Sequence, residues 1–177
     1  MDEKFPPNKI DYKIIDLWHL KSRKIESEFP VEILDIMPQL EPILHLNGQY
    51  IQIYDTTTMG YAFISKSNET VLGYSLEEIK AKKALFMFEI YCSADAKAST
   101  IIHDQIREHG MMQPVNIRHH FRYTNTFRAK HKNGHYIWLL NHLIYLASLP
   151  DGTPHLMLSY ATDISHIKNN DHIPFSI

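Results

Sequence analysis

Residues 118–164 read RHHFRYTNTFRAKHKNGHYIWLLNHLIYLASLPDGTPHLMLSYATDI and predict three antiparallel β-strands in sequence. Between Arg118 and Lys130 the even positions are polar and several odd positions are apolar, the pattern of a strand with one face on a core. Asn133-Gly134 and Asp151-Gly152 are typical of tight β-hairpin turns. We therefore expect strands over about 118–131, 135–148 and 154–164.

The loop at Asn133-Gly134 decides which side chains share a face, because two-residue and three-residue loops give opposite pairings. We favour a three-residue loop, Lys132 to Gly134, with Gly134 at positive φ. One face of the sheet then carries Phe127, Ala129, Ile137, Leu139, Asn141, Leu143, Met157, Ser159 and Ala161. The other carries Tyr136, Trp138, Leu140, Leu158 and Tyr160.

Two short strands and three helices are expected before this meander. Residues 50–54 and 61–64 are β-rich. A helix opens near Ser67-Asn68-Glu69 and ends at Gly73, and Ser75 with Glu78 matches a capping box for the next helix. A longer helix is predicted from about Asp95 to His109, with Gly110 as its stop and a buried stripe of Ala98, Ile101, Ile102 and Ile106.

The N-terminal region has a different character. Residues 10–28 predict an amphipathic helix, since Ile10, Ile14, Leu17 and Ile25 fall near one stripe. Residues 30–47 contain three prolines that allow only short helical turns, and we interpret them as a connector rather than a layer of the core. We divide the chain into a helical extension over 1–47, a domain over 48–168 and a linker tail over 169–177.

Composition excludes several classes of protein. Eighteen Lys and Arg against 20 Asp and Glu give a formal net charge of −2, which argues against a primary nucleic-acid-binding role. A single cysteine, Cys92, excludes an internal disulfide and fits a reducing compartment. The N-terminus lacks leader features, and the most apolar stretch, 137–149, is too short to span a bilayer. We expect a cytoplasmic domain with no membrane partner.

Four motifs in order resemble the PAS family, and the resemblance runs from about Tyr50 to Lys168. They are Phe63-Ile64-Ser65, then Val71-Leu72-Gly73-Tyr74-Ser75 with Glu77-Glu78-Ile79, then Phe127 to Gly134 with Trp138, and finally Asp163-Ile164-Ser165. The resemblance implies an α+β PAS fold, a five-stranded antiparallel sheet with short helices on one face and an N-terminal helical extension. One departure is Cys92-Ser93-Ala94-Asp95, where many relatives carry a His-Pro-x-Asp turn and only Asp95 fits.

The PAS resemblance implies a sensory module whose concave sheet face binds a small ligand. The expected ligand-binding residues are Phe63, Phe86, Phe88, Phe127, Leu139, Asn141, Met157, Ser159 and Ala161. Asn141 is the most informative, because a buried amide needs hydrogen-bond partners that a ligand could supply. The alternative is that Phe63, Phe86, Phe88 and the long helix fill the cavity, which leaves a module for dimerisation only.

The opposite face is too apolar for bare solvent, so we expect it to be covered. The helix over 10–28, from the same chain or from a partner, is the natural cover, and the resemblance implies a homodimer. This dimer or extension face comprises Ile14, Leu17, Trp138, Leu140, Leu158 and Tyr160. Asp163, Ile164 and Ser165 are expected to pass the signal to an output domain.

The flanking segments resemble the sensory half of bacterial transcription regulators that carry a LuxR-type helix-turn-helix. The resemblance rests on the N-terminal helical extension, the Leu-Gly-Tyr-Ser segment and the tail Asp-Ile-Ser-His-Ile-Lys. The 177 residues contain no helix-turn-helix pattern. DNA contact is therefore expected only through a domain outside this chain, which would be a piece of a longer regulator.

The sequence assigns neither a cofactor nor a catalytic group. No histidine pair has the helical spacing that converges on a metal, and no metal site is expected. His103 and His109 lie on the predicted long helix, where haem-binding relatives place an axial ligand, so a haem-type redox or gas sensor is a third hypothesis. The surroundings of Cys92 do not resemble the Gly-Arg-Asn-Cys-Arg-Phe-Leu segment of the flavin-binding branch. Without a phosphate-cradling loop, a serine elbow or an identifiable base for Cys92, we predict that the protein is not an enzyme.

Overall fold

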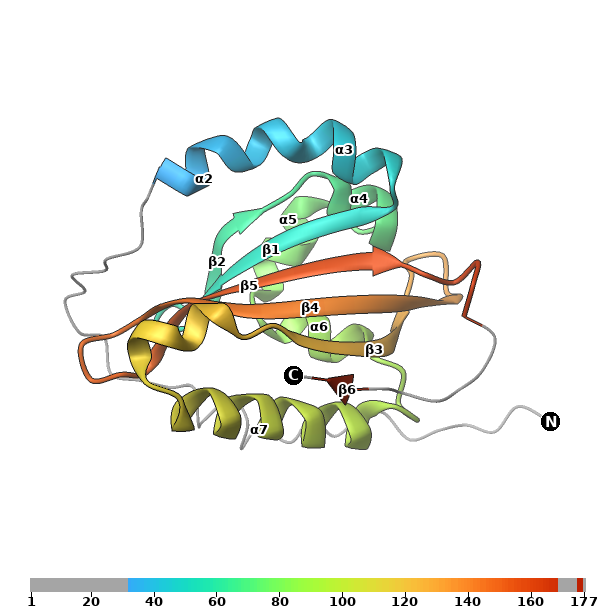
Figure 1. The fold of residues 1–177 in the computed structure, drawn as a ribbon. Helices are drawn as coiled ribbons and strands as arrows, with labels where there is room; N and C mark the ends of the chain where they lie inside the picture. Colours follow the sequence, from blue (N-terminus) through green and yellow to red (C-terminus); the bar gives the residue numbers. More distant parts are fainter. Residues whose placement is uncertain (1–31, 169–174, 177) are drawn as a thin grey trace.

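A six-stranded antiparallel sheet in the order β2-β1-β5-β4-β3-β6 is the centre of the structure (Figure 1). The computed structural model describes residues 32–168 and 175–176. The strands are β1 (Gln49–Asp55), β2 (Gly60–Ile64), β3 (Tyr123–Lys130), β4 (Tyr136–Ser148), β5 (Pro154–Asp163) and β6 (Phe175–Ser176). The first five are the expected sheet, and the two-residue β6 adds to the free edge of β3 from a tail that was expected to be only a linker.

Helices lie on both sides of this sheet. They are α2 (Glu32–Ile36), η1 (Met37–Leu40), α3 (Glu41–Leu46), α4 (Ser67–Leu72), α5 (Leu76–Lys82), α6 (Leu85–Ile90), α7 (Ala96–Met112) and η2 (Val115–His120). In Figure 1, α4 to α6 lie behind the sheet, α7 runs along the bottom and α2 to α3 along the top. None of the described helices is long and apolar enough to cross a bilayer.

The inner face of the sheet, which carries Tyr50, Phe127, Leu139 and Ala161, packs against α4, α5 and α6. Buried helix residues in this cluster are Val71, Leu72, Ile79, Phe86, Met87 and Ile90. Nearby, Ile102 and Ile106 of α7 pack against Tyr123, Leu143 and Tyr145. Strand alternation places all these sheet residues on one side, so the core lies between the sheet and α4 to α7.

The predicted hairpin register is confirmed. Phe127 pairs with Leu139 and Ala129 with Ile137, and the His131 amide donates to the His135 carbonyl across 2.8 Å. Residues 132–134 form the loop, and Gly134 has φ +95°. This register places Asn141 on the inner face.

Two predicted signals upstream of the meander are also confirmed. Gly73 ends α4 with φ +79°, a left-handed conformation that favours glycine. Ser75 and Glu78 form the capping box at the start of α5.

The strand predicted from 118 begins five residues later, at Tyr123, because residues 115–120 form η2. Arg118 is buried there, and its guanidinium donates to the carbonyls of Gln113, at 3.0 Å, Met111 and Gly152. A buried guanidinium needs such acceptors. The alternation predicted that Arg118 lies on the polar face of a strand, and this prediction is wrong because Arg118 is buried in η2.

Gly110 does not stop the long helix, which continues to Met112. A Cβ atom at Gly110 would lie 2.4 Å from Cε2 of Tyr145, so the glycine lets β4 approach α7 closely. The buried stripe also differs from the expectation: Ser99, Ile102, Ile106 and Gly110 are buried, whereas Ile101 is 50% exposed.

Residues 32–46 form the short helical turns that the prolines predict, but they are a layer of the core and not a connector. Met37 and Leu44 are buried against Ile51, Ile53 and Leu156 on the outer face of the sheet. These turns thus cover part of the outer face of the sheet, which the helix over 10–28 was expected to cover. That helix, with Ile14 and Leu17, lies outside the described residues.

Candidate functional site

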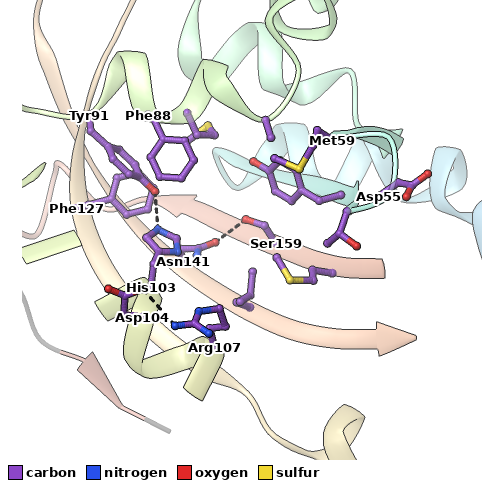
Figure 2. Close-up of a pocket in the computed structure, with 16 residues that line it drawn as sticks. Asp55, Met59, Phe88, Tyr91, His103, Asp104, Arg107, Phe127, Asn141 and Ser159 are labelled. Atoms are coloured by element: carbon purple, nitrogen blue, oxygen red, sulfur yellow. Dashed lines mark hydrogen bonds and ion pairs between the residues drawn. The ribbon is translucent and has the colours of Figure 1, made fainter. Parts of the chain in front are cut away.

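A cavity of about 100 Å³ lies between the inner face of the sheet and α6 and α7 (Figure 2). The strands and the β1–β2 turn contribute Tyr54, Asp55, Thr56, Met59, Phe127, Asn141, Leu143, Met157 and Ser159. Residues 84–91 contribute Ala84, Met87, Phe88 and Tyr91, and α7 contributes His103, Asp104 and Arg107. In Figure 2, Phe88, Tyr91 and Phe127 lie on one side of the cavity and Met59 and Asp55 on the other, and the Asn141–Ser159 hydrogen bond lies below them in this view.

The structure brings five of the expected ligand-binding residues to this cavity: Phe88, Phe127, Asn141, Met157 and Ser159. Phe86, Leu139 and Ala161 are on the same side of the sheet but are fully buried in the core cluster.

Phe63 lies on the other side of the sheet. It pairs with Ile53, whose side chain points to the outer face, and directly paired residues share a face. Phe63 therefore packs with the cluster around Met37 and Leu44 and does not line the cavity.

Asn141 forms a polar bridge across three strands. Its Oδ1 accepts from Ser159 Oγ of β5 at 2.6 Å, and its Nδ2 donates to Asn125 Oδ1 of β3 at 3.3 Å. The protein thus supplies partners that were expected from a ligand. A side-chain amide has two N–H donors and two acceptor lone pairs, so one of each can still serve a ligand.

Tyr91 and His103 form a second polar pair on the cavity wall. The Tyr91 hydroxyl lies 3.1 Å from Nε2 of His103 (Figure 2). Burial lowers the pKa of His103 to about 4, and burial also raises the pKa of Tyr91. Both side chains are therefore neutral at pH 7.

Tyr54 connects the cavity to a buried polar network that sequence reasoning missed. Its hydroxyl donates to Gln52 Oε1 at 2.5 Å, Gln52 Nε2 donates to Asn68 Oδ1 at 2.7 Å, and Asn68 Nδ2 donates to the Ser65 carbonyl at 2.8 Å. Burial raises the pKa of Tyr54 far above its ordinary value. The spacing of Tyr50, Gln52 and Tyr54 along β1 was the available signal, because alternate strand residues share a face.

Three charged side chains in the cavity lining, Asp55, Asp104 and Arg107, already have partners. Burial acts to raise the pKa of Asp55, but hydrogen bonds from the Thr57 side chain and backbone outweigh it, and the pKa lies below its ordinary value. Nε2 of His155 is 3.5 Å from the same carboxylate. On α7, Nη2 of Arg107 lies 3.8 Å from Oδ1 of Asp104.

The predicted output residues fasten the end of β5 to two other strands. Asp163 Oδ1 accepts from the backbone N and the Oγ of Ser165, and Ser165 Oγ accepts from the Trp138 amide at 2.9 Å. The Ile164 amide donates to the Trp138 carbonyl, and the Asp163 amide donates to the Gly48 carbonyl. These bonds join the end of β5 to residues at the starts of β4 and β1.

Trp138, on the outer face, is flanked by two cations. Cζ of Arg128 lies 5.2 Å and Nζ of Lys168 lies 4.7 Å from the ring centroid. Arg128 also binds the buried carboxylate of Asp95, with Nε 2.9 Å from Oδ2. Asp95, which matches the PAS pattern, thus anchors the start of α7 to β3. The other residues of the predicted dimer face, Leu140, Leu158 and Tyr160, are half-buried.

Histidines meet only in pairs in the described part of the chain: the rings of His119 and His120 lie 4.1 Å apart and those of His131 and His135 lie 4.6 Å apart, centroid to centroid. Over residues 32–168 and 175–176, no group of three or more His, Cys, Asp or Glu side chains converges on a common point. His103 lines the cavity, whereas Nδ1 of His109 lies 2.9 Å from the Tyr123 hydroxyl. Cys92 is a buried free thiol that does not line the cavity.

No model of a protein family matches the sequence, and no curated protein matches it. Solved structures do match. The N-terminal domain of a diguanylate cyclase with a PAS/PAC sensor from Marinobacter aquaeolei has 18% identity and a TM-score of 0.54, over 67% of this chain and 96% of that chain. A PAS domain from Colwellia psychrerythraea has 19% identity and a TM-score of 0.52, over 75% and 99% of the two chains.

A third match is a sensory box histidine kinase/response regulator from Burkholderia thailandensis, with 14% identity and a TM-score of 0.51 over 72% of this chain and 86% of that chain. Together with the strand order, these likenesses establish the α+β PAS fold predicted from the four motifs.

Proposed function

We propose that residues 48–168 form a sensory module whose cavity binds a small molecule and reports its presence through the end of β5. The cavity beside the Asn141–Ser159 hydrogen bond supports this most directly. Protein cores are normally close-packed, and a cavity lined by apolar walls with a few polar groups is typical of a ligand site. The sensor proteins among the solved structures of similar fold also support it.

The proposed mechanism uses the contacts that Ser159 makes on β5. A ligand that bonds to the remaining N–H or lone pair of Asn141 would weaken the Asn141–Ser159 bond and so loosen β5 from β4, four residues before Asp163. The Asp163–Ser165 contacts with Trp138 and Gly48 would then shift. Only a ligand with different affinity for the two arrangements can move this equilibrium.

The cavity is proposed to bind its ligand and not to convert it. A histidine with a pKa of about 4 is a weak base at neutral pH, and the Tyr91–His103 pair suits hydrogen-bond recognition better than proton transfer.

We propose a DNA-binding transcription regulator as the attached output. The support is the resemblance of the extension, the Leu-Gly-Tyr-Ser segment and the Asp-Ile-Ser-His-Ile-Lys tail to the sensory half of LuxR-type regulators. Operator binding by a longer natural protein that contains this chain, measured with and without ligand, tests the assignment. Binding that ignores the ligand would contradict it.

We also propose that the chain forms a homodimer. Ile36, Leu40, Ile43 and Leu46 form an apolar stripe on the solvent side of α2 to α3, and their exposed fractions run from 39% to 82%. Their spacing of three to four residues is that of one helix face, and such a stripe needs a partner. The same stripe supports the second candidate function, a module for dimerisation alone.

Native mass spectrometry of freshly purified chain, beside its denatured mass, tests the sensory proposal. We expect excess mass per chain that is lost on denaturation. An apo protein that also fails to bind any small molecule in a solution screen would leave the dimerisation-only function.

A further inference from the structure

We infer that the ligand is an uncharged molecule with one six-membered ring and a single amide, carbonyl or hydroxyl group that bonds to Asn141. This inference rests on the proposed sensory function, because it names the ligand class of the same cavity. It follows from the size of the cavity, the chemistry of its walls and the charges around it.

The cavity is small and partly open to solvent. Its volume of about 100 Å³ is below the roughly 150 Å³ of an apolar cavity that holds benzene and far below the roughly 300–1,000 Å³ of sites for drug-sized ligands, so one ring is the largest apolar group that it can take. Three wall residues, Met59, Met87 and Met157, are unbranched and flexible, so the walls can yield enough for one ring.

The walls favour an aromatic guest. Phe88 and Tyr91 meet edge to face with centroids 5.8 Å apart, and Tyr91 and Phe127 do so at 4.7 Å. A ligand ring beside them continues the same edge-to-face packing. The methionine sulfurs add favourable contacts with an aromatic ring.

Asn141, which lines the cavity from the sheet, offers hydrogen bonds and carries no charge. Asn141 keeps one N–H and one lone pair beyond its bonds to Asn125 and Ser159, which suits an amide, carbonyl or hydroxyl group. The Tyr91–His103 pair on the wall is also neutral at pH 7, since burial lowers the pKa of His103 to about 4.

The charged side chains in the cavity lining already have partners in the protein. Asp55 accepts from Thr57 and faces His155, and Arg107 lies beside Asp104. A charged ligand group beside Asn141 would therefore lose its water and meet only charged side chains that already have partners, which is costly. The cavity should select against both anions and cations.

Three molecules of the same shape test the inference: benzamide, benzoate and benzamidinium. Their affinities for the full chain at pH 7 are measured by amide NMR titration. We expect benzamide to bind at least tenfold more tightly than either ion. Asn141→Leu should weaken benzamide binding about fivefold or more, the equivalent of one buried hydrogen bond.

Two further variants test the site even if Asn141→Leu prevents the protein from folding. Ser159→Val narrows the cavity and suits a strand, and it should weaken benzamide binding as well. Phe63→Leu, on the opposite face of the sheet, is the matched control and should leave benzamide affinity unchanged.

The outcomes separate the ligand class from the sensory function. Equal or tighter binding of benzoate or benzamidinium would overturn the class and leave the function standing. So would a co-purified ligand in native mass spectra of a protein that binds none of the three probes. Benzamide binding that Phe63→Leu abolishes, and that Asn141→Leu and Ser159→Val leave intact, would overturn the site. Failure of all three probes in a protein with no co-purified ligand would overturn the ligand class, and the sensory function falls only if a solution screen of small molecules also finds no binder.

Discussion

Asn141 connects the three central strands of the sheet with one side chain, because it lies on β4 and bonds to Asn125 on β3 and Ser159 on β5. Groups of this kind stabilise only while every member is satisfied. The side chain proposed to recognise the ligand is therefore also part of the fold, and a change at Asn141 acts on both.

Asn141→Leu should lower the free energy of unfolding by about 1–3 kcal/mol, because it leaves Ser159 Oγ and Asn125 Oδ1 buried without this partner. Urea denaturation measures the change. Ser159→Ala, which removes one hydrogen bond and leaves the Asn141–Asn125 contact, should cost less. Wild-type stability in Asn141→Leu would mean that these side chains do not form the described bridge.

His103 should make stability fall as the pH is lowered from about 6.5 toward 4. Burial lowers its folded pKa to about 4 from the ordinary 6.5, so the unfolded chain takes up the proton first. The stabilisation that comes from the neutral, buried imidazole is fully present above the unfolded pKa of His103, and it is lost as the pH falls toward the folded pKa. Between pH 6.5 and 5 the loss should be about 1–2 kcal/mol.

Urea denaturation of the wild type and of His103→Gln across this pH range isolates the contribution of His103. The difference in pH slope between the two proteins should vanish above about pH 7. A wild-type slope in His103→Gln would contradict the burial of this imidazole.

At the scale of elements, the close approach of α7 to β4 depends on one glycine. A Cβ atom at Gly110 would meet the ring of Tyr145, whose hydroxyl lies 3.4 Å from the Ile106 carbonyl. Helix propensity favours alanine over glycine by about 1 kcal/mol, so the sign of the substitution shows which effect is larger.

Gly110→Ala should destabilise the protein by about 1–3 kcal/mol, the usual cost of overpacking. Thermal or urea unfolding measures it. In a Tyr145→Leu background, which removes the ring, the same substitution should become neutral or stabilising. Stabilisation in the wild-type background would show that the ring and the helix have room between them.

The elements that could be predicted from sequence are those set by neighbouring residues. The hairpin at Lys132–Gly134, the left-handed Gly73 and the Ser75–Glu78 capping box each depend on a few consecutive positions. Once the hairpin register is set, alternation places Phe127, Asn141 and Ser159 on one face, and so part of the candidate site could be predicted as well.

The errors fall where a residue depends on a partner far along the chain. Gly110 faces Tyr145, and Arg118 bonds to Gly152, and neither contact leaves a local pattern. Phe63 reaches the outer face through its pairing with Ile53, a pairing that precedes a register shift in β1. From the sequence alone, His103 was a candidate only for haem ligation, because no pattern along α7 places it beside Tyr91.

At the scale of the whole molecule, we propose that chains associate through the apolar stripe on α2 to α3. Wild-type protein should sediment as a dimer at high concentration, and Ile43→Glu and Leu46→Glu should shift it to monomer, because each places a charge in an apolar interface. Ile167→Glu, at an exposed isoleucine outside the stripe, is the control and should remain dimeric. A monomeric wild type would remove the homodimer proposal.

The proposed sensory function requires that a ligand in the cavity changes the end of β5, and one measurement tests this connection directly. Amide NMR spectra of the chain are compared without ligand and saturated with its co-purified ligand or, in its absence, with benzamide. We predict shifts at residues lining the cavity, Asn141 and Ser159 among them, and also at Asp163, Ile164 and Ser165. Cavity amides that do not respond, or a response that stops before Asp163, would contradict the account.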